Sequence, residues 1–264
     1  MKKTFLALAI LTILFYSCTE EIQESDSTQA CQDHLIAENI FNEVGYIIEE
    51  GLGSANGGSC PNYIRINDPD TSGIETLIID FGGTNCLHRN KEKRGIINIT
   101  YTGKLRDSLS VITSTFDNYY VNNNLVQGER IATNQGKNNN GNMWFTIDIN
   151  NASIQTSNGI IDWESNIVRE WVDGQHSPEI EDDRYKISGS ASGIGANNNA
   201  FTMNITGALD VDLGCLPSCV VKSGTAKISP NGYTDRIINY GNSLCDCNVN
   251  VIIDGVTYPI VISN

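Results

Sequence analysis

Few side chains of this sequence stand at the spacing of a known catalytic motif. The three histidines, His34, His88 and His176, lie far apart in the chain, and none has a partner at motif spacing. The segment 189–193 has Ala191 at the position where a nucleophile elbow carries its serine. Acidic residues are so abundant that choosing two of them as the acid and base of a glycosidase would be arbitrary. The sequence therefore favours a protein that is not an enzyme and needs no cofactor.

One segment partly matches a metal-binding loop. Asp68-Pro-Asp-Thr-Ser-Gly73 resembles the first half of a calcium loop, with oxygen-bearing side chains at loop positions 1, 3 and 5 and glycine at position 6. Loop position 12, where a bidentate glutamate should complete the coordination shell, is Ile79. The sequence therefore predicts a turn between two strands here and no metal site.

Aromatic side chains could bind a ligand by stacking. Trp163, Arg169 and Trp171 fall on one face of a predicted strand at even spacing, and Tyr119 and Trp144 lie on neighbouring predicted strands. Rings of this size stack on sugars, but they also dominate the cores of β proteins. The pattern favours core positions and leaves glycan stacking by the three tryptophans as the alternative.

The N-terminus has the layout of a lipoprotein signal. Residues 1–17 contain two lysines, an apolar run of about 12 residues and a small residue before Cys18, whereas a membrane-spanning helix needs roughly 20 residues. This layout predicts cleavage before Cys18 and lipidation of its thiol. Residues 18–28 are short, polar and acidic, which predicts a tether. Acidic residues directly after the lipidated cysteine resemble surface-export signals of Gram-negative bacteria. We expect a lipid anchor in the outer membrane facing the cell exterior, with the periplasmic face as the alternative.

The charge of the chain restricts its partners. Removing residues 1–17 takes away two lysines and no acids, so the formal net charge changes from −14 to −16. So acidic a protein is repelled by nucleic acid and by bare anionic membrane. The charge favours cations, basic proteins or neutral ligands such as glycans.

Two segments that end in cysteine resemble each other. Ile78–Cys86 and Ile237–Cys245 both match I-I-[DN]-[FY]-G-x3-C, and each final cysteine lies 26 residues after another cysteine. A second similar pair is 138–149 and 197–205, which share an asparagine run followed by Phe-Thr-x-[DN]-Ile. These matches predict an internal pseudo-repeat of one hairpin module within a single domain, residues 29–264.

The cysteines are expected to form disulfides, because an exported protein folds in an oxidising compartment. The candidates are Cys60, Cys86, Cys215, Cys219, Cys245 and Cys247. The repeated spacing suggests pairing Cys60 with Cys86 and Cys219 with Cys245, which leaves Cys215 to pair with Cys247. A zinc site is the alternative, but structural zinc sites use wider spacing at both ends of the ligand set. Cys31 remains, and we expect it to be buried and free.

One helix and about 13 strands must position these residues. The helix is predicted at roughly 29–50, where Ile36, Ile40, Val44 and Ile47 repeat with helical periodicity. We expect it to cover one face of a sheet; a helix that binds a partner is the alternative. Short apolar and polar alternations after Cys60 predict strands at roughly 60–67, 75–82, 93–103, 109–121, 125–134, 142–157, 160–172, 184–192, 200–212, 219–229, 234–240, 247–253 and 256–262.

These elements define the predicted fold class, which is mainly β. Many strands are apolar on one face only, as in 97–102, and a sheet of that kind buries one face. With some 13 strands, an antiparallel meander curls into a sandwich or an open barrel. The segments 121–125 and 253–256 are the clearest hairpin turns.

Four segments resemble a known group of proteins. They are Thr115-Phe-Asp-Asn-Tyr-Tyr-Val-Asn-Asn-Asn-Leu-Val-Gln-Gly, Thr133-Asn-Gln-Gly with Asn140-Gly-Asn, Arg169-Glu-Trp, and Ile238-Asn-Tyr-Gly with Cys245-Asp. Together they are similar to an uncharacterised family of surface-exposed bacterial lipoproteins, over nearly the whole mature chain. The resemblance implies the order signal, lipidated cysteine, helix and β domain, and it implies no activity or ligand.

The sequence thus predicts a lipid-anchored protein of the cell envelope whose domain is a non-enzymatic binding or structural module. Its partner would be a glycan or another surface protein. Two alternatives stay open: a lipid carrier or assembly factor, which needs a large apolar cavity, and a glycan-active enzyme, which needs two carboxylates facing each other across a cleft.

Overall fold

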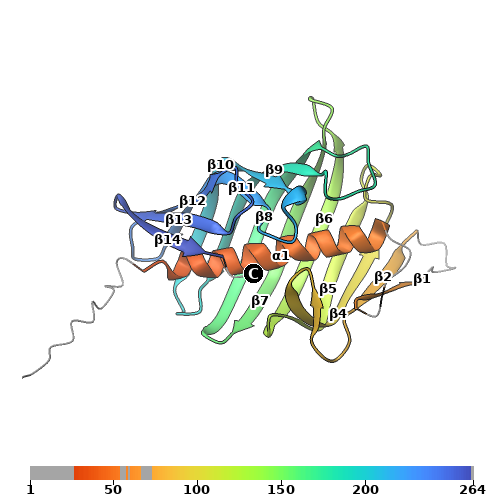
Figure 1. The fold of residues 1–264 in the computed structure, drawn as a ribbon, viewed down its shortest axis with the longest axis horizontal. Coiled ribbons are helices and arrows are strands. Elements are labelled where there is room, and N and C mark those ends of the chain that lie inside the picture. Colours follow the sequence, from red (N-terminus) through yellow and green to blue (C-terminus); the bar gives the residue numbers. More distant parts are fainter. Residues whose placement is uncertain (1–26, 54–57, 59, 67–72, 263–264) are drawn as a thin grey trace, which may run out of the picture.

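The computed structural model describes residues 27–53, 58, 60–66 and 73–262 of the chain. These residues form one N-terminal helix and one sheet of 14 strands (Figure 1). The signal peptide, Cys18 and the tether up to residue 26 lie outside the described residues. So do residues 67–72, which hold most of the calcium-loop resemblance. Among the described residues, no helix has the length and apolarity that crossing a membrane requires.

The strands follow one another as an antiparallel meander, which confirms the predicted fold class. Helix α1 spans Gln29–Gly53. The strands are β1 (Asn62–Ile66), β2 (Glu75–Asp80), β3 (Cys86–His88), β4 (Lys91–Tyr101), β5 (Val111–Val121), β6 (Asn124–Lys137), β7 (Met143–Thr156), β8 (Gly159–Asp173), β9 (Arg184–Ile194), β10 (Ala200–Asp212), β11 (Val221–Pro230), β12 (Arg236–Asn242), β13 (Asn248–Ile253) and β14 (Val256–Val261). The 13 predicted strands are all present. Only the short β3, which pairs with β4, was not predicted.

Alternation along the strands determines which face of the sheet is buried. In β7, Phe145, Ile147 and Ile149 are buried, whereas the intervening Thr146 and Asp148 are partly exposed. Successive side chains of a strand point to opposite faces, so this alternation gives the sheet one apolar and one polar face. The apolar face is the concave one, and the space that it encloses is called the lumen below.

The two predicted hairpin turns have the backbone that their sequences favour. Asn122 and Asn123 join β5 to β6 with φ of 48° and 64°, and Asp254 and Gly255 join β13 to β14 with φ of 49° and 83°. Two successive residues with positive φ match the right-handed twist of the flanking strands. These turns therefore set the register of the two hairpins.

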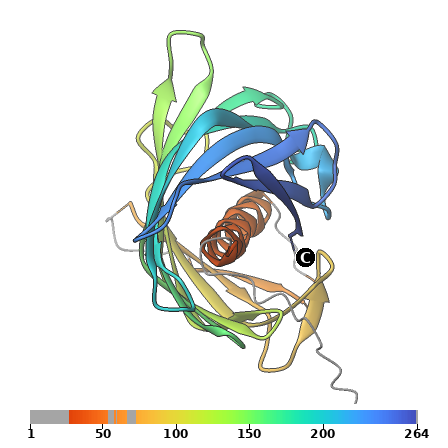
Figure 2. The ribbon, with the colours of Figure 1, turned by 90° about the vertical axis from the view of Figure 1, so that its left-hand side faces the viewer.

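Helix α1 lies in the lumen, enclosed by the curled sheet (Figure 2). The sheet is not closed, because β1 and β14 are the two ends of the pairing order and do not pair with each other. Of the predicted alternatives, the open barrel is therefore right and the two-layer sandwich is not. The helix packs its apolar side chains against the concave face, for example Val44 and Ile47, which are fully buried.

The polar side of α1 is also enclosed, and this differs from a helix that covers a sheet from outside. Glu43 and Glu49 are both buried. Their charges are balanced by basic residues on the concave face: Lys93 lies 2.6 Å from Glu43, and Arg169 lies 2.5 Å from Glu49. A buried carboxylate needs such a partner. The lumen is therefore filled by the helix and by ion pairs.

Three disulfides are present, one with the predicted pairing and two with a different one. Cys60 pairs with Cys86 as predicted, and Cys31 is buried and free as predicted. The pairing of Cys219 with Cys245 and of Cys215 with Cys247 is wrong, because the structure joins Cys215 to Cys245 and Cys219 to Cys247. Both bonds connect the β10–β11 connection to the β12–β13 connection. The chain direction of these connections decides which cysteines face each other, and the repeat spacing does not show it.

Candidate functional site

The three tryptophans do not form one exposed row. Trp163 and Trp171 both lie on the lumen face of β8, with exposed fractions of 4% and 1%. Trp163 stacks on Phe41 of α1 with 5.8 Å between ring centroids, and its indole N–H donates to His34 Nδ1 at 3.3 Å. Trp144 is partly exposed and alternates with the buried Phe145 on β7. Trp163 is thus a core residue, and Trp144 lies on the opposite face of the sheet.

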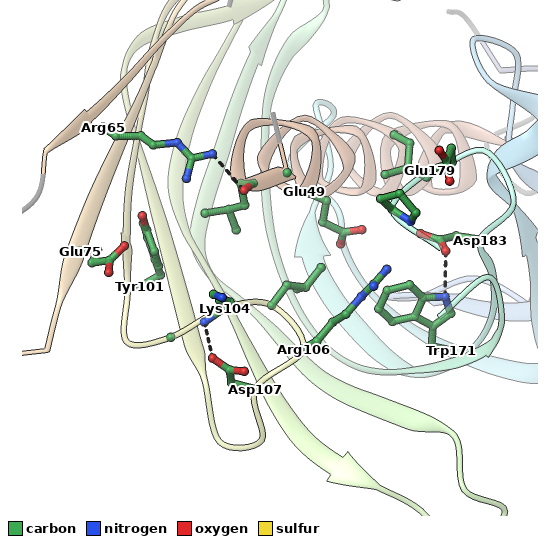
Figure 3. A pocket seen from close by; sticks show the side chains of 16 residues that line it. Glu49, Arg65, Glu75, Tyr101, Lys104, Arg106, Asp107, Trp171, Glu179 and Asp183 are labelled. Carbon is green, nitrogen blue, oxygen red and sulfur yellow. Dashed lines mark hydrogen bonds between the residues drawn. The ribbon is translucent and has the colours of Figure 1, made fainter. Parts of the chain in front are cut away.

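A pocket with a volume of about 550 Å³ opens at the C-terminal end of α1. It lies between the β4–β5 connection and the β8–β9 connection (Figure 3). We call it the helix-end pocket. Glu49 of α1, Trp171 of β8 and Asp183, which directly precedes β9, contribute to its wall, and Arg106 projects into it from the β4–β5 connection.

Glu49 is held in the wall by an ion pair with Arg169. The distance from Arg169 Nη2 to Glu49 Oε1 is 2.5 Å, and both side chains are almost fully buried. The guanidinium also lies 4.3 Å from the centre of the Tyr185 ring. Burial opposes the charge of Arg169, but the attraction of Glu49 outweighs it, and the pKa of Arg169 is raised. Glu49 and Arg169 therefore form a fixed ion pair at the inner end of the pocket.

Asp183 is a second buried carboxyl in the same wall, and its exposed fraction is 2%. The Trp171 indole N–H donates to its Oδ1 at 3.0 Å, and the Tyr185 hydroxyl lies 3.1 Å from its Oδ2. Burial, together with the nearby charge of Glu49, raises the pKa of Asp183 to about 7. Asp183 can thus bind a proton near neutral pH.

Two arginines shape the outer part of the pocket. Arg106 donates to the carbonyl oxygen of Ser177, and its guanidinium lies 5.1 Å from the centre of the Trp171 ring. It therefore joins the β4–β5 connection to the β8–β9 connection. Arg65 of β1 donates to the carbonyl oxygens of Gly51 and Leu52 at 2.7 and 2.9 Å. These are carbonyls of the last helical turn, so Arg65 caps α1 at the pocket.

A second group of charges lies deeper in the sheet and away from the pocket. Glu43 pairs with Lys91 and Lys93. Burial alone would raise the pKa of Glu43, but the two ammonium groups have the larger effect, so the pKa is lowered. The Tyr119 hydroxyl is buried without a hydrogen-bond partner among the described residues. These contacts fix α1 in the lumen and leave little space for a ligand.

The histidines that the sequence singled out play other roles. His34 is fully buried, and burial lowers its pKa to about 3, so it is a neutral acceptor for Trp163. His88 lies 3.7 Å from Glu50 near the other side of the helix end. His176 is exposed in the β8–β9 connection. In the part of the chain that the structure describes, no three His, Cys, Asp or Glu side chains gather as metal ligands.

Sequence reasoning did not identify Glu49, Tyr185 and Asp183 as a group. Glu49 lies near the end of the predicted helix, and Asp183 lies between two predicted strands. One signal was available: Arg169 shares a strand face with Trp163 and Trp171, and an inward-facing arginine requires a buried acid. The acid could not be chosen without the fold, because it comes from a helix 120 residues earlier in the chain.

Comparison of the chain with models of protein families, with curated proteins and with solved structures finds no match. The resemblance to a family of surface lipoproteins therefore stays an expectation from the sequence. What the protein does has to be argued from the helix-end pocket and from the predicted anchor.

Proposed function

We propose that this protein is held in the outer membrane by lipid on Cys18, facing the cell exterior, and that its β domain is a non-enzymatic binding module. Its partner is another surface molecule, a protein or a glycan, and the helix-end pocket is where that partner binds. The acidic segment after Cys18 supports the orientation, and the signal-length apolar run supports the anchor.

The helix-end pocket is the observation that carries the binding proposal. Its volume of about 550 Å³ falls within the range of ligand sites, roughly 300–1,000 Å³. Its wall combines apolar side chains such as Leu105 and Ile180 with polar groups held in place by hydrogen bonds and ion pairs. A preformed wall of this kind favours binding because few side chains must be ordered when the ligand arrives.

The contents of the lumen weigh against the lipid-carrier alternative. A carrier needs a large apolar cavity, whereas α1 occupies the lumen and its apolar side chains pack against the concave face. The wall of the helix-end pocket also contains too many charged groups for an acyl chain. The carboxyls of Glu49 and Asp183 are both engaged within the wall, which favours a binding role over a catalytic one.

Arrays of envelope glycans and of synthetic peptides test the binding proposal. We expect the wild-type domain to be retained on some members, and Leu105→Trp to lose that retention because the larger ring fills the pocket. Leu87→Trp is the matched control: Leu87 is 70% exposed on β3 and does not line the pocket, so its substitution should leave retention unchanged. Retention that survives Leu105→Trp would place binding elsewhere.

Lipidation is tested by the variant Cys18→Ser. The substitution removes the thiol that would carry the lipid, so we expect the protein to leave the membrane fraction and to lose palmitate labelling. Protease added to intact cells then reports the orientation of the wild-type protein, since only an outward-facing domain is digested. Unchanged detergent partition of the variant would refute the anchor.

A further inference from the structure

One carboxyl in the helix-end pocket has hydrogen-bond donors but no counter-charge. Asp183 accepts from the Trp171 indole and contacts the Tyr185 hydroxyl, yet no basic side chain of the described residues forms an ion pair with it. The buried guanidinium of Arg169 is already paired with Glu49. A buried carboxylate without a cation is unfavourable, so this position is complete only with a proton or with a positively charged group.

The Tyr185 hydroxyl lies between Asp183 and Glu49. Its oxygen lies 3.1 Å from Asp183 Oδ2 and 3.5 Å from Glu49 Oε2. A hydroxyl has one proton to donate, so it cannot donate to both carboxyls at once. Arg169 is the ion-pair partner of Glu49, and when Tyr185 donates to Glu49, Asp183 Oδ2 is left without its hydroxyl donor. Asp183 is therefore the carboxyl of this pair whose charge is the less completely compensated by the wall.

The other charged groups around Asp183 do not supply the missing cation. From its own connection, Asp182 adds a second negative charge, and Glu49 faces it from α1. Arg106 of the β4–β5 connection lies over the Trp171 ring and donates to Ser177 instead. The full pocket lining holds five carboxyls and three basic groups: Glu49, Glu75, Asp107, Glu179 and Asp183 against Arg65, Lys104 and Arg106.

We propose that the pocket receives the side chain of a lysine from a basic partner protein, and that its ammonium group binds beside Asp183 as the counter-charge that the wall does not supply. Where Asp183 is protonated, its proton leaves to solvent as the ammonium group arrives. This inference rests on the proposed binding function and names the chemistry that the pocket recognises.

The charge of the chain and the covered Trp171 ring favour a cationic side chain over an anion or a sugar. The chain has a formal net charge of −14, which attracts basic proteins and repels anions. The excess of carboxyls in the lining of the pocket also attracts a positively charged group. The Trp171 ring is 1% exposed and partly covered by Arg106, so it offers no open face on which a sugar could stack.

The Trp171 indole N–H reports changes in the charge of Asp183 directly, because it donates a hydrogen bond to that carboxyl. The chain has three tryptophans and so gives three indole cross-peaks in a ¹H–¹⁵N spectrum, and Trp171→Phe assigns the relevant one. The probes are Nα-acetyl-lysinamide and its neutral counterpart Nα-acetyl-norleucinamide. Between pH 6 and 8 the lysine amine stays protonated, so any pH dependence comes from the protein.

We expect the lysine probe to move the Trp171 peak toward its high-pH position, as loss of the Asp183 proton would. Its apparent affinity should rise about tenfold from pH 6 to pH 8, because the ionised fraction of a carboxyl that titrates near 7 rises from roughly one-tenth to nine-tenths. The norleucine probe should bind more weakly and without pH dependence.

Asp183→Asn removes the charge and keeps an oxygen for the Trp171 indole, so it should abolish the preference for the lysine probe. Glu181→Gln, an equal charge change on the same connection but outside the pocket lining, should preserve it. The wild-type titration with the two probes needs no substitution at Asp183 and decides the question even if Asp183→Asn does not fold. Equal affinity for both probes, or array retention on glycans alone, would overturn the lysine proposal and leave the binding function intact. Absence of any retention or probe binding would overturn both.

Discussion

At the scale of single residues, Trp163 and Trp144 show how a tryptophan in the core differs from one on the outer face of the sheet. Trp163 is buried against Phe41 and donates to His34, whereas Trp144 is partly exposed on the other face of the sheet. Truncating a buried tryptophan costs about 3–5 kcal/mol, because a cavity remains and a hydrogen bond is lost. The same truncation on the outer face removes little packing.

We therefore predict that Trp163→Ala lowers the melting temperature by roughly 6–20 °C for a domain of this size, and Trp144→Ala by only a few degrees. Differential scanning calorimetry of the two variants beside the wild type measures this. Similar losses for both substitutions would show that Trp144 is also packed in the folded protein.

At the scale of elements, much of the fold could be predicted from the sequence because the sheet buries only one face. A strand such as β7 then alternates visibly, and Asn or Gly residues mark its turns. The three residues of β3 are too few to show an alternation, so this strand was missed. Helix α1 was predicted from its periodicity, but its place in the lumen was not.

The position of α1 could not be predicted because acidic residues on a helix normally indicate a face exposed to solvent. Glu43 and Glu49 are buried only because Lys93 and Arg169 face them from two different strands. Gly45 has a similar partner: a Cβ at this residue would lie 2.8 Å from the Arg130 guanidinium, so the absence of a side chain lets β6 approach the helix. Such pairings depend on contacts far apart in the sequence. The helix-end pocket has the same origin, since its wall comes from the helix, two connections and several strands.

At the scale of the whole molecule, an acidic protein encloses an interior in which several acids stay neutral or paired. Glu38 of α1 accepts a hydrogen bond from Tyr240 at 2.8 Å, and burial raises its pKa to about 7 despite that bond. Asp183 is raised to a similar value. In the unfolded chain both acids ionise near pH 4, so the folded state binds more protons between about pH 4 and 7.

The sign of the pH dependence follows from these raised pKa values. The stability that the protonated carboxyls contribute is fully present below their unfolded pKa values and is lost as the pH rises through about 7. His34 acts in the opposite direction, since its pKa is lowered to about 3 and its contribution is lost as the pH falls below about 6.5. Two carboxyls outweigh one histidine, and we expect the free energy of unfolding to decrease from about pH 5 to pH 8.

Glu38→Gln isolates one of these contributions, because glutamine can still accept the Tyr240 hydrogen bond and has no proton to lose. Relative to the wild type, we expect the variant to gain stability at pH 8, on the order of 3 kcal/mol at most, and to gain much less, under about 1 kcal/mol, at pH 5. Urea unfolding at both pH values measures the difference. Glu164→Gln, at an exposed position on β8, should change neither value. A gain of equal size at pH 5 and pH 8 would mean that Glu38 is ionised in the folded protein, and the pH dependence would then need another source.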